Sequence, residues 1–430
     1  MPTFPHARSD AAAILSTLRK GGAVVRTRPQ NQIQIRRSWN FSLTAALVLL
    51  CPFDLIASLG MDMYLPAVPD MPGILGTTPE RVQFTLSGYL VLLGMGQLVF
   101  GPLSDRLGRR PVLLTGAVAY TFASLALVWT HTFWPFVLLR IGQAAGGAAM
   151  LVATFATVRD VYADRPEGAR IYGVMSAILV FVPAFGPLLG AGLYEVGGLR
   201  AIFLPLALLA AMAGLRAFRV WPETKPAEHD DKGVQLRSFG TVLRNRDFWR
   251  YTLGYGVAMG SFFVYFSIAP ALLVHHYGYS PLGFALLFGT VALVLFGTSR
   301  FSNRMIERHG LAGCFSRGLR LVVLGALLLV VREVAFDHVV AFMLPMWIIA
   351  VGIALIVSVA ANGALVAFSE IAGTATALYH CASSLCFVAA GTAAVVLLPG
   401  ESAWPLVVYG TLGGSSVLLL SSRTARERRG

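Results

Sequence analysis

Long apolar segments alternate with short polar connections along most of the chain. From Phe41 onward, each apolar run ends in a short segment that contains Arg, Gly or Pro. A helix of about 20 residues crosses the hydrocarbon layer of a bilayer, so each run predicts one membrane span. We predict twelve spans, at residues 41–66, 82–103, 111–131, 134–157, 169–194, 200–220, 248–274, 281–301, 311–331, 339–360, 371–398 and 402–422.

The composition excludes a water-soluble globular protein. Apolar residues make up 56% of the chain and charged residues 13%, with a mean hydropathy of +0.69, which leaves too little polar surface to cover a soluble core. The predicted fold class is therefore an all-α integral membrane protein. The four cysteines show no spacing typical of a disulfide framework or a metal site, and we expect neither a metal ion nor a cofactor.

The positive charge is concentrated on one side of the predicted spans. The 34 Lys and Arg residues outnumber the 21 Asp and Glu residues, giving a net charge of +13, which in a soluble protein would indicate a nucleic-acid partner. Thirty of the basic residues lie in the two termini or near the connections after even-numbered spans, and three lie near the other connections. Because basic loops stay on the side of insertion, we expect both termini in the cytoplasm and no nucleic-acid partner.

The longest connection divides the spans into two groups of six. It contains Pro222, Pro226 and a cluster of charges. Two six-helix bundles around a central cavity fit alternating access, in which the bundles rock about a site at mid-membrane. We predict a leader at 1–40, a first bundle at 41–220, a linker at 221–247, a second bundle at 248–422 and a basic tail at 423–430.

The leader is polar, rich in Arg and without an apolar stretch long enough for a secretory signal, so we expect it to be disordered. No Met lies between Met1 and Met61, and a shorter product would need a different start codon. We hypothesise that part of the leader is absent from the native protein, which N-terminal sequencing would test.

The string GPLSDRLGRR (101–110) follows the second span. Its Asp can accept hydrogen bonds from a helix N-terminus or from the neighbouring Arg residues, although an ordinary basic loop is the simpler interpretation. The string resembles the signature loop of the major facilitator superfamily, where these residues form a gate at the cytoplasmic end. The connection 299–310 is at the corresponding place in the second half. It lacks the leading Gly and the Asp, so a second gate there is in doubt. The resemblance implies gating roles for Gly101, Asp105, Arg106, Gly108, Arg109 and Arg110.

Arg140 interrupts the fourth span and precedes a run of small residues in LRIGQAAGGAAM (139–150), which allows another helix to pack closely. A cation in hydrocarbon is costly, unless the side chain reaches the membrane interface. The string resembles the superfamily's fourth-helix motif, in which the matching Arg faces the cavity and takes part in proton coupling.

The fifth span contains VPAFGPLLGAG (182–192). Proline kinks a helix, which membrane helices tolerate where neighbours compensate, so a packing kink is one interpretation. The string resembles the motif that distinguishes drug/proton antiporters of the superfamily from importers. The motif residues are Pro183, Gly186, Pro187 and Gly190.

Two carboxylates, Asp54 and Asp62, lie in the first span. Eight residues place them about 80° apart around a helix and about 12 Å along it, so both can face one side. An ionised carboxylate in hydrocarbon needs water, a partner or a proton; burial favours its protonated form and a nearby cation its ionised form. We expect Asp54, Asp62 and Arg140 to take part in proton coupling, with the two acids binding the proton and Arg140 tuning their pKa, and we expect all three to contact the substrate. The simpler alternatives are an interfacial position for Asp62 and a structural hydrogen-bonding role for Asp54.

The spacing of these acids also resembles that in multidrug antiporters of the superfamily. In the second half we noted no comparable buried charge within the seventh, eighth, tenth or eleventh span, and we expect proton binding to be concentrated in the first half. The string GSFFVYFSIAP (260–270) offers aromatic side chains instead. Most such rings pack against neighbours or lipid, but some can line a cavity for a ring-bearing ligand. The candidate substrate-binding residues are Phe262, Phe263, Tyr265, Phe266, Asn362 and Tyr379.

Longer strings resemble the chloramphenicol and florfenicol exporters of the superfamily, among them CPFDLIASLGMDMYLPAVPDMPGILGTTPE (51–80), ATFATVRDVYADRPEGARIYG (153–173), SVAANGAL (358–365) and AWPLVVY (403–409). The similarity runs from Trp39 to the last span. It implies a twelve-helix major facilitator fold and a monomeric antiporter of the bacterial inner membrane that exchanges phenicol antibiotics for protons and confers resistance.

Three other functions remain open. The function most similar to phenicol export is transport of another small solute by the same fold. Drug-susceptibility tests with and without the protein would distinguish the two. An intramembrane enzyme would need clustered His and acidic residues or a nucleophile elbow, and the sequence contains neither. A receptor or scaffold gives no reason for two acids and an Arg within the membrane, and it would bind a ligand without moving it.

Overall fold

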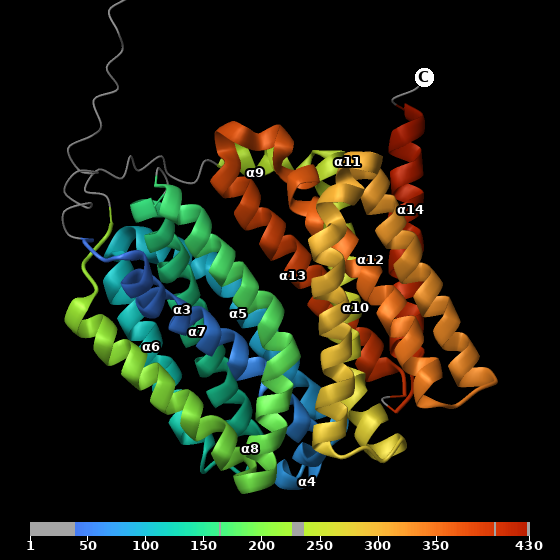
Figure 1. Cartoon of the computed structure of the whole chain (residues 1–430), viewed down its shortest axis with the longest axis horizontal. Coiled ribbons are helices and arrows are strands. Elements are labelled where there is room, and N and C mark those ends of the chain that lie inside the picture. Colours follow the sequence, from blue (N-terminus) through green and yellow to red (C-terminus); the bar gives the residue numbers. More distant parts are fainter. Residues whose placement is uncertain (1–38, 163–164, 226–235, 400, 428–430) are drawn as a thin grey trace, which may run out of the picture.

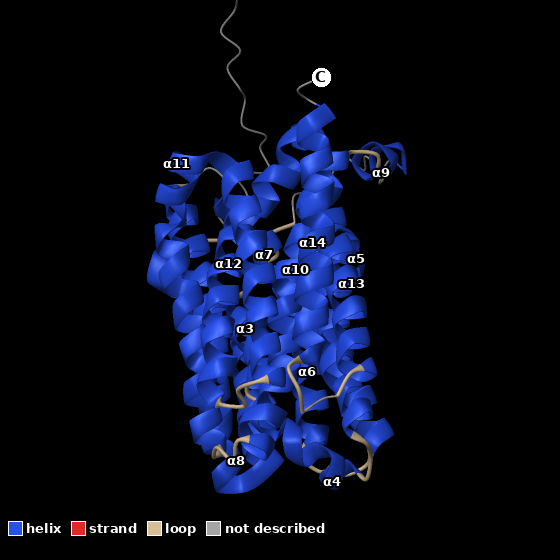
Figure 2. Ribbon diagram, turned by 90° about the vertical axis from the view of Figure 1, so that its right-hand side faces the viewer, coloured by secondary structure: helices blue, strands red, loops and turns tan. Residues whose placement is uncertain are grey.

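The computed structural model describes residues 39–162, 165–225, 236–399 and 401–427, and within them every regular element is a helix (Figures 1 and 2). The predicted leader, up to residue 38, lies outside the described residues. The helices are α3 (Leu43–Asp62), η1 (Leu65–Asp70), α4 (Met71–Leu75), α5 (Pro79–Leu107), α6 (Arg109–Leu127), α7 (Phe133–Tyr162), α8 (Pro166–Val220), α9 (Leu236–Leu243), α10 (Arg246–Pro270), η2 (Ala271–His276), α11 (Pro281–Val334), α12 (Val339–Leu365), η3 (Val366–Ile371), α13 (Ala372–Leu397) and α14 (Trp404–Glu427).

Ten helices in the described part of the chain are long and apolar enough to cross a membrane, and two of them hold two spans each. The 55-residue α8 leaves helical geometry at Gly197 and Gly198, and the 54-residue α11 does so at Gly310, where φ is 69°. A straight helix of that length would measure about 80 Å, far more than a bilayer. Figure 1 shows the chain reversing in both. The all-α membrane fold expected from the sequence is confirmed.

Local signals in the sequence set where several helices begin. The Ser42 and Ser280 hydroxyls and the Asn245 amide oxygen accept hydrogen bonds from the first turns of α3, α11 and α10, at 3.3, 3.1 and 2.9 Å, which satisfies backbone donors that have no partner in the helix.

The first predicted span extends too far, because α3 ends at Asp62 and a short η1–α4 segment follows. The connection 221–247, predicted as a linker, contains the helix α9.

The helices form two groups in space. The first-half helices α3 and α5 to α8 pack together, as do the second-half helices α10 to α14, and the groups meet where α5 contacts α13 and α8 contacts α11 (Figure 1). We call the end of the molecule that carries Trp39, α9 and Glu427 the basic end, because the basic connections lie there, and the end with α4 the opposite end.

An aromatic cluster joins the two ends of the first half at the basic end. The Trp39 ring, just before α3, lies 5.3 Å from the Trp221 ring, just after α8, and the Phe53 ring lies 5.8 Å from Trp221. Trp39 Nε1 also donates to the hydroxyl of Tyr162 on α7 at 2.8 Å. The cluster therefore holds the first, fourth and sixth spans together.

Candidate functional site

The two carboxylates of α3 are buried and lack a cationic partner. Asp54 lies in the middle of the helix and Asp62 is its last residue. Asp54 Oδ2 has no hydrogen-bond partner, and neither carboxylate forms an ion pair with a described basic residue. Because an ionised carboxylate without partners is costly away from water, both carboxyl groups need water, a ligand or a proton to be stable there.

Arg140 of α7 is held inside the first half and does not reach the membrane interface. Its side chain is 1% exposed, and its Nη1 donates to the backbone oxygen of Gly60 at 2.8 Å and to Oε1 of Gln143 at 2.6 Å. Its guanidinium also lies 4.7 Å from the centre of the Tyr64 ring and 4.3 Å from that of Tyr89, a favourable arrangement for a cation. Arg140 therefore binds the backbone of the last turn of α3 rather than a carboxylate.

Hydrogen bonds from two tyrosines and a glutamine fix this arrangement. The Tyr89 and Tyr120 hydroxyls donate to the backbone oxygens of Ala57 and Ile56 at 2.8 and 2.9 Å, and Gln143 Nε2 donates to Ser124 Oγ at 2.8 Å. These contacts bring α5, α6 and α7 against the last two turns of α3.

The predicted antiporter motif of α8 packs against the same end of α3. A side chain at Gly186 would place its Cβ 2.5 Å from Cβ of Asp62, and one at Gly190 would overlap the backbone oxygen of Met63. The nearby Pro187 is buried and Pro183 is partly buried. Absence of a side chain at both glycines therefore permits close contact between the fifth and first spans, directly beside Asp62.

The signature loop forms a charged cluster at the basic end. Arg109 is fully buried; its Nε lies 2.8 Å from Asp160 Oδ2, and its Nη1 lies 2.5 Å from Asp105 Oδ1. The Glu223 carboxylate accepts hydrogen bonds from the backbone nitrogens of Arg109 and Arg110 at 2.8 and 3.2 Å, where a carboxylate suits the start of α6.

The remaining signature residues lie around this cluster. Gly108 has a φ of 107°, and a side chain there would collide with the carboxylate of Glu223. The backbone oxygen of Arg106 accepts from Lys225 Nζ at 2.6 Å. No described residue outside its own helix lies within 4 Å of a Cβ at Gly101, so no other helix packs closely against it in this arrangement.

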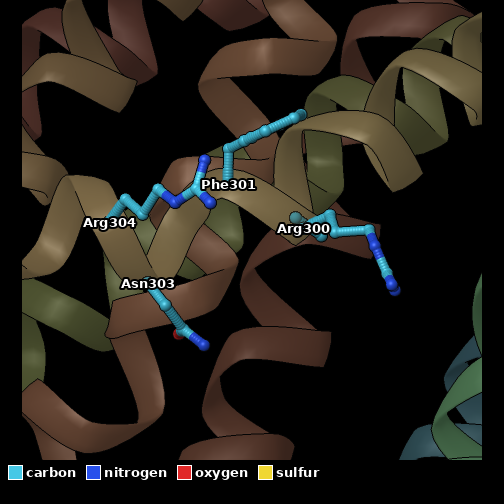
Figure 3. Close-up of a pocket in the computed structure, with 5 residues that line it drawn as sticks. Arg300, Phe301, Asn303 and Arg304 are labelled. Atoms are coloured by element: carbon cyan, nitrogen blue, oxygen red, sulfur yellow. The ribbon is translucent and has the colours of Figure 1, made fainter.

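The corresponding connection of the second half has no such cluster. Within the described residues, no ion pair involves the basic side chains of 299–310. Instead, a pocket of about 550 Å³ is lined by one stretch of α11 that includes Arg300, Asn303 and Arg304. Figure 3 shows Arg300 and Asn303 extending to one side of this helix, and Phe301 and Arg304 to another. The Arg304 guanidinium lies 5.9 Å from the centre of the Phe301 ring.

The structure brings three of the predicted second-half aromatics together in a packed core. Tyr265 stacks on Phe288 with ring centres 5.0 Å apart, and Phe262 and Phe266 lie 6.2 and 5.8 Å from the same ring. This core belongs to α10 and α11.

The other predicted second-half residues lie outside this core. Phe263 packs instead against Phe387 and Gly391 of α13. The Tyr379 ring lies 5.3 Å from that of Tyr255, and Asn362 is exposed near the end of α12.

Uncharged polar residues join the two halves toward the opposite end. Gln83 Nε2 of α5 donates to Ser267 Oγ of α10 at 2.9 Å, and the hydroxyls of Ser87 and Thr392 lie 2.7 Å apart between α5 and α13. Farther along, a Cβ at Gly94 would lie 2.8 Å from Ser384 Oγ. Among the described residues, the hydrogen bonds between the halves thus lie toward the opposite end of α5.

Sequence reasoning missed several of these residues. Asp160 and Glu223 hold the signature loop but lie about 50 and 110 positions from it, so no local spacing marks them. Gln83 and Gln143 did carry a signal, because an amide within an apolar span needs a partner or water.

At the opposite end, a second charged cluster forms around the loop between α11 and α12. Asp337, in the loop after α11, accepts a hydrogen bond from the Tyr277 hydroxyl at 2.8 Å, and its carboxylate lies 2.7 Å from His276 Nε2 and 3.1 Å from Arg332 Nη2. Burial alone would raise the pKa of Asp337, but the bonds from Tyr277 and His276 and the charge of Arg332 outweigh it and lower that pKa below its usual value. This cluster connects η2 with the end of α11.

Comparison with known proteins identifies the family. The Major Facilitator Superfamily profile matches residues 50–391. A chloramphenicol resistance protein of Pseudomonas aeruginosa is 50% identical over 385 residues, covering 89% of this chain and 91% of that protein. A bicyclomycin resistance protein homolog of Haemophilus influenzae is 24% identical and covers 80% of this chain and 86% of its own length. A peptide transporter crystallised with sulfate shares the fold, with a TM-score of 0.73 and 14% identity over 93% of this chain and 98% of its own. The chain therefore belongs to the major facilitator superfamily and is a membrane transporter, not an enzyme.

Proposed function

We propose that the protein exports phenicol antibiotics, chloramphenicol and florfenicol, across the bacterial inner membrane in exchange for protons, and so confers resistance. The observation that carries this proposal is the 50% identity, over nearly the full length of both chains, with a protein named for chloramphenicol resistance. The antiporter-like packing of Gly186 and Gly190 against α3 supports export by the same fold.

In this proposal the basic end faces the cytoplasm, and the protein works as a monomer. The distribution of Lys and Arg supports the orientation, since basic connections remain on the cytoplasmic side. The division into a first bundle at 41–220 and a second at 248–422 agrees with the two groups of packed helices. Rocking of these bundles would expose a central site to one side and then the other.

The proton-binding groups in this proposal are Asp54 and Asp62. Their burial and lack of cationic partners support a role in which each carries charge in one step and a proton in another. In this proposal Arg140, whose guanidinium is held against the last turn of α3 through Gly60, tunes the proton affinity of the two acids. Proton uptake from outside would then release the bound drug outward.

The gate at the cytoplasmic end would be formed by the signature loop. Arg109 links the second span to the fourth through Asp105 and Asp160, and Glu223 attaches the linker to the same point. A movement of the linker would therefore act directly on the start of α6.

Transport into inverted membrane vesicles tests the proposal. Labelled chloramphenicol or florfenicol should accumulate when a pH gradient is imposed, and Asp54→Asn should abolish that accumulation at an unchanged level of protein in the membrane. Glu401→Gln, at an exposed residue in the loop before α14, is the matched control and should transport normally. Undiminished transport by Asp54→Asn would refute the proton-binding assignment.

A second candidate function is export of other or more varied drugs. It is favoured by relatives at 24–26% identity that are named for resistance to bicyclomycin or to multiple drugs. A susceptibility panel in a host without its own exporters distinguishes the two: phenicol export predicts protection against phenicols alone, and the broader function predicts protection against several unrelated classes.

A further inference from the structure

Two polar residues within the predicted spans take part in none of the contacts above. Gln97 lies in the middle of α5 and is exposed, and His380 lies within α13 and is partly exposed. Neither side chain has a hydrogen bond to another described residue. Because an unpaired amide or imidazole in hydrocarbon is unfavourable, both need water or a ligand.

The contacts between α5 and α13 put these residues near one another. The two helices run in opposite directions, with Ser87 beside Thr392 and Gly94 beside Ser384. Gln97 follows Gly94 by three residues, and His380 precedes Ser384 by four, so each lies about one turn farther toward the basic end. Gln97 and His380 therefore lie on either side of the boundary between the two halves, about one helical turn beyond the Gly94–Ser384 contact.

The same stripe of α5 shows that Gln97 faces the second half rather than lipid. Positions 83, 87, 94 and 97 fall within about 80° around an α-helix. The first three contact α10 or α13, whereas Gln97 is exposed. Gln97 therefore lies on the face of α5 that points toward the second half, about one turn beyond the last contact. Its side chain extends into the space between the halves.

An aromatic wall adjoins His380. The Tyr379 ring lies 5.2 Å from the imidazole and 5.3 Å from the ring of Tyr255 on α10, and the Tyr379 hydroxyl is buried without a partner. An imidazole in its neutral form, an amide and a phenol carry no charge but offer both donors and acceptors. This combination suits a neutral ligand with an aromatic ring and amide or hydroxyl substituents.

We propose that Gln97 and His380 form a drug-contacting pair across the two halves, hydrogen-bonding the polar substituents of a neutral aromatic drug whose ring lies against Tyr379. This inference rests on the proposed function, because it names residues that bind the exported drug. It adds His380, in the second half, to the candidate drug-binding residues.

Cysteine accessibility tests the location of the pair. In a background with Cys51, Cys314, Cys381 and Cys386 replaced by Ser, Gln97→Cys and His380→Cys should react with a membrane-impermeant thiol reagent in inverted vesicles, since thiol reactivity requires the water-stabilised thiolate. Val99→Cys is the matched control: it is on the opposite face of α5, two residues away and 62% exposed, and should not react. Chloramphenicol should slow labelling of the first two at least fivefold.

Transport separates failure of this inference from failure of the proposed function. Gln97→Ala and His380→Ala should each raise the KM for chloramphenicol about fivefold, the effect of one lost hydrogen bond, at an unchanged protein level, and His380→Asn should restore part of it. If the unmodified protein exports no phenicol, the proposed function is wrong. If it does export and the two cysteines label like Val99→Cys, or the drug fails to protect them, or both alanine variants keep their KM, the assignment of this pair is overturned.

Discussion

Replacing Asp160 with Asn should destabilise the protein more than replacing Asp105 with Asn, although only Asp105 belongs to the signature loop. Both carboxylates pair with the fully buried Arg109, but Asp160 is 7% exposed and Asp105 is 37% exposed. A hydrogen bond to a buried charge contributes about 1.5–3 kcal/mol, and an ion pair with an exposed partner about 0.2–1 kcal/mol. At about 2–4 °C per kcal/mol for a bundle of this size, Asp160→Asn should lower the melting temperature by roughly 3–12 °C, and Asp105→Asn by less than about 4 °C.

The measurement is the fraction of purified protein that remains monodisperse in detergent after heating. Glu401→Gln controls for loss of a negative charge at an exposed site and should melt like the unmodified protein. Drug export measured in parallel should fall in Asp105→Asn without a comparable loss of stability, since that residue lies at the predicted gate. An equal or larger loss of stability in Asp105→Asn would refute the argument from burial.

Three other outcomes follow from the structure. Gly190→Ala should abolish export and cost about 1–3 kcal/mol of stability, because a methyl group there overlaps a backbone oxygen after α3, whereas Gly192→Ala, with open space around it, should be neutral or stabilising in the same heating assay. Arg140→Lys should lose most vesicle transport despite keeping the charge, because a compact ammonium cannot stack between the Tyr64 and Tyr89 rings as the planar guanidinium does; transport near the original level would contradict this role. Asp337→Asn should lower the melting temperature slightly at pH 7 and have a smaller effect at pH 3. The lowered pKa of Asp337 means that its contribution is present above the unfolded-state value of about 3.9 and is lost as the pH falls through the folded-state value; an equal effect at both pH values would argue against it.

The sequence predicted the fold well because membrane spans are marked by local composition. Each apolar run must form a helix of bilayer length to satisfy its own backbone hydrogen bonds, so local composition was enough to predict the spans. The first and last residues of the helices were predicted less well. The prediction continued the first span past Asp62, because the residues of η1 are also apolar, and it missed α9 within the charged linker.

The sequence indicated which residues belong to the site but not which residues they bond to. Asp54, Asp62 and Arg140 stand out because charge is rare in apolar segments. That Arg140 bonds the backbone of Gly60 instead of a carboxylate depends on how α7 crosses α3, and no local pattern encodes that crossing. His380 was not among the second-half candidates, which were aromatic residues and Asn362, because a single histidine in an apolar span forms no local pattern.

The tryptophan cluster has a consequence for how the chain can be divided. Trp39 and Trp221 close the first half on itself before the linker begins, and Thr224 Oγ1 still lies 3.2 Å from Thr157 Oγ1 of α7. A break in the polypeptide between residues 225 and 236 would therefore leave each set of six spans with its own neighbours. Two separately synthesised fragments, produced in the same cell, should find each other in the bilayer and restore a working transporter.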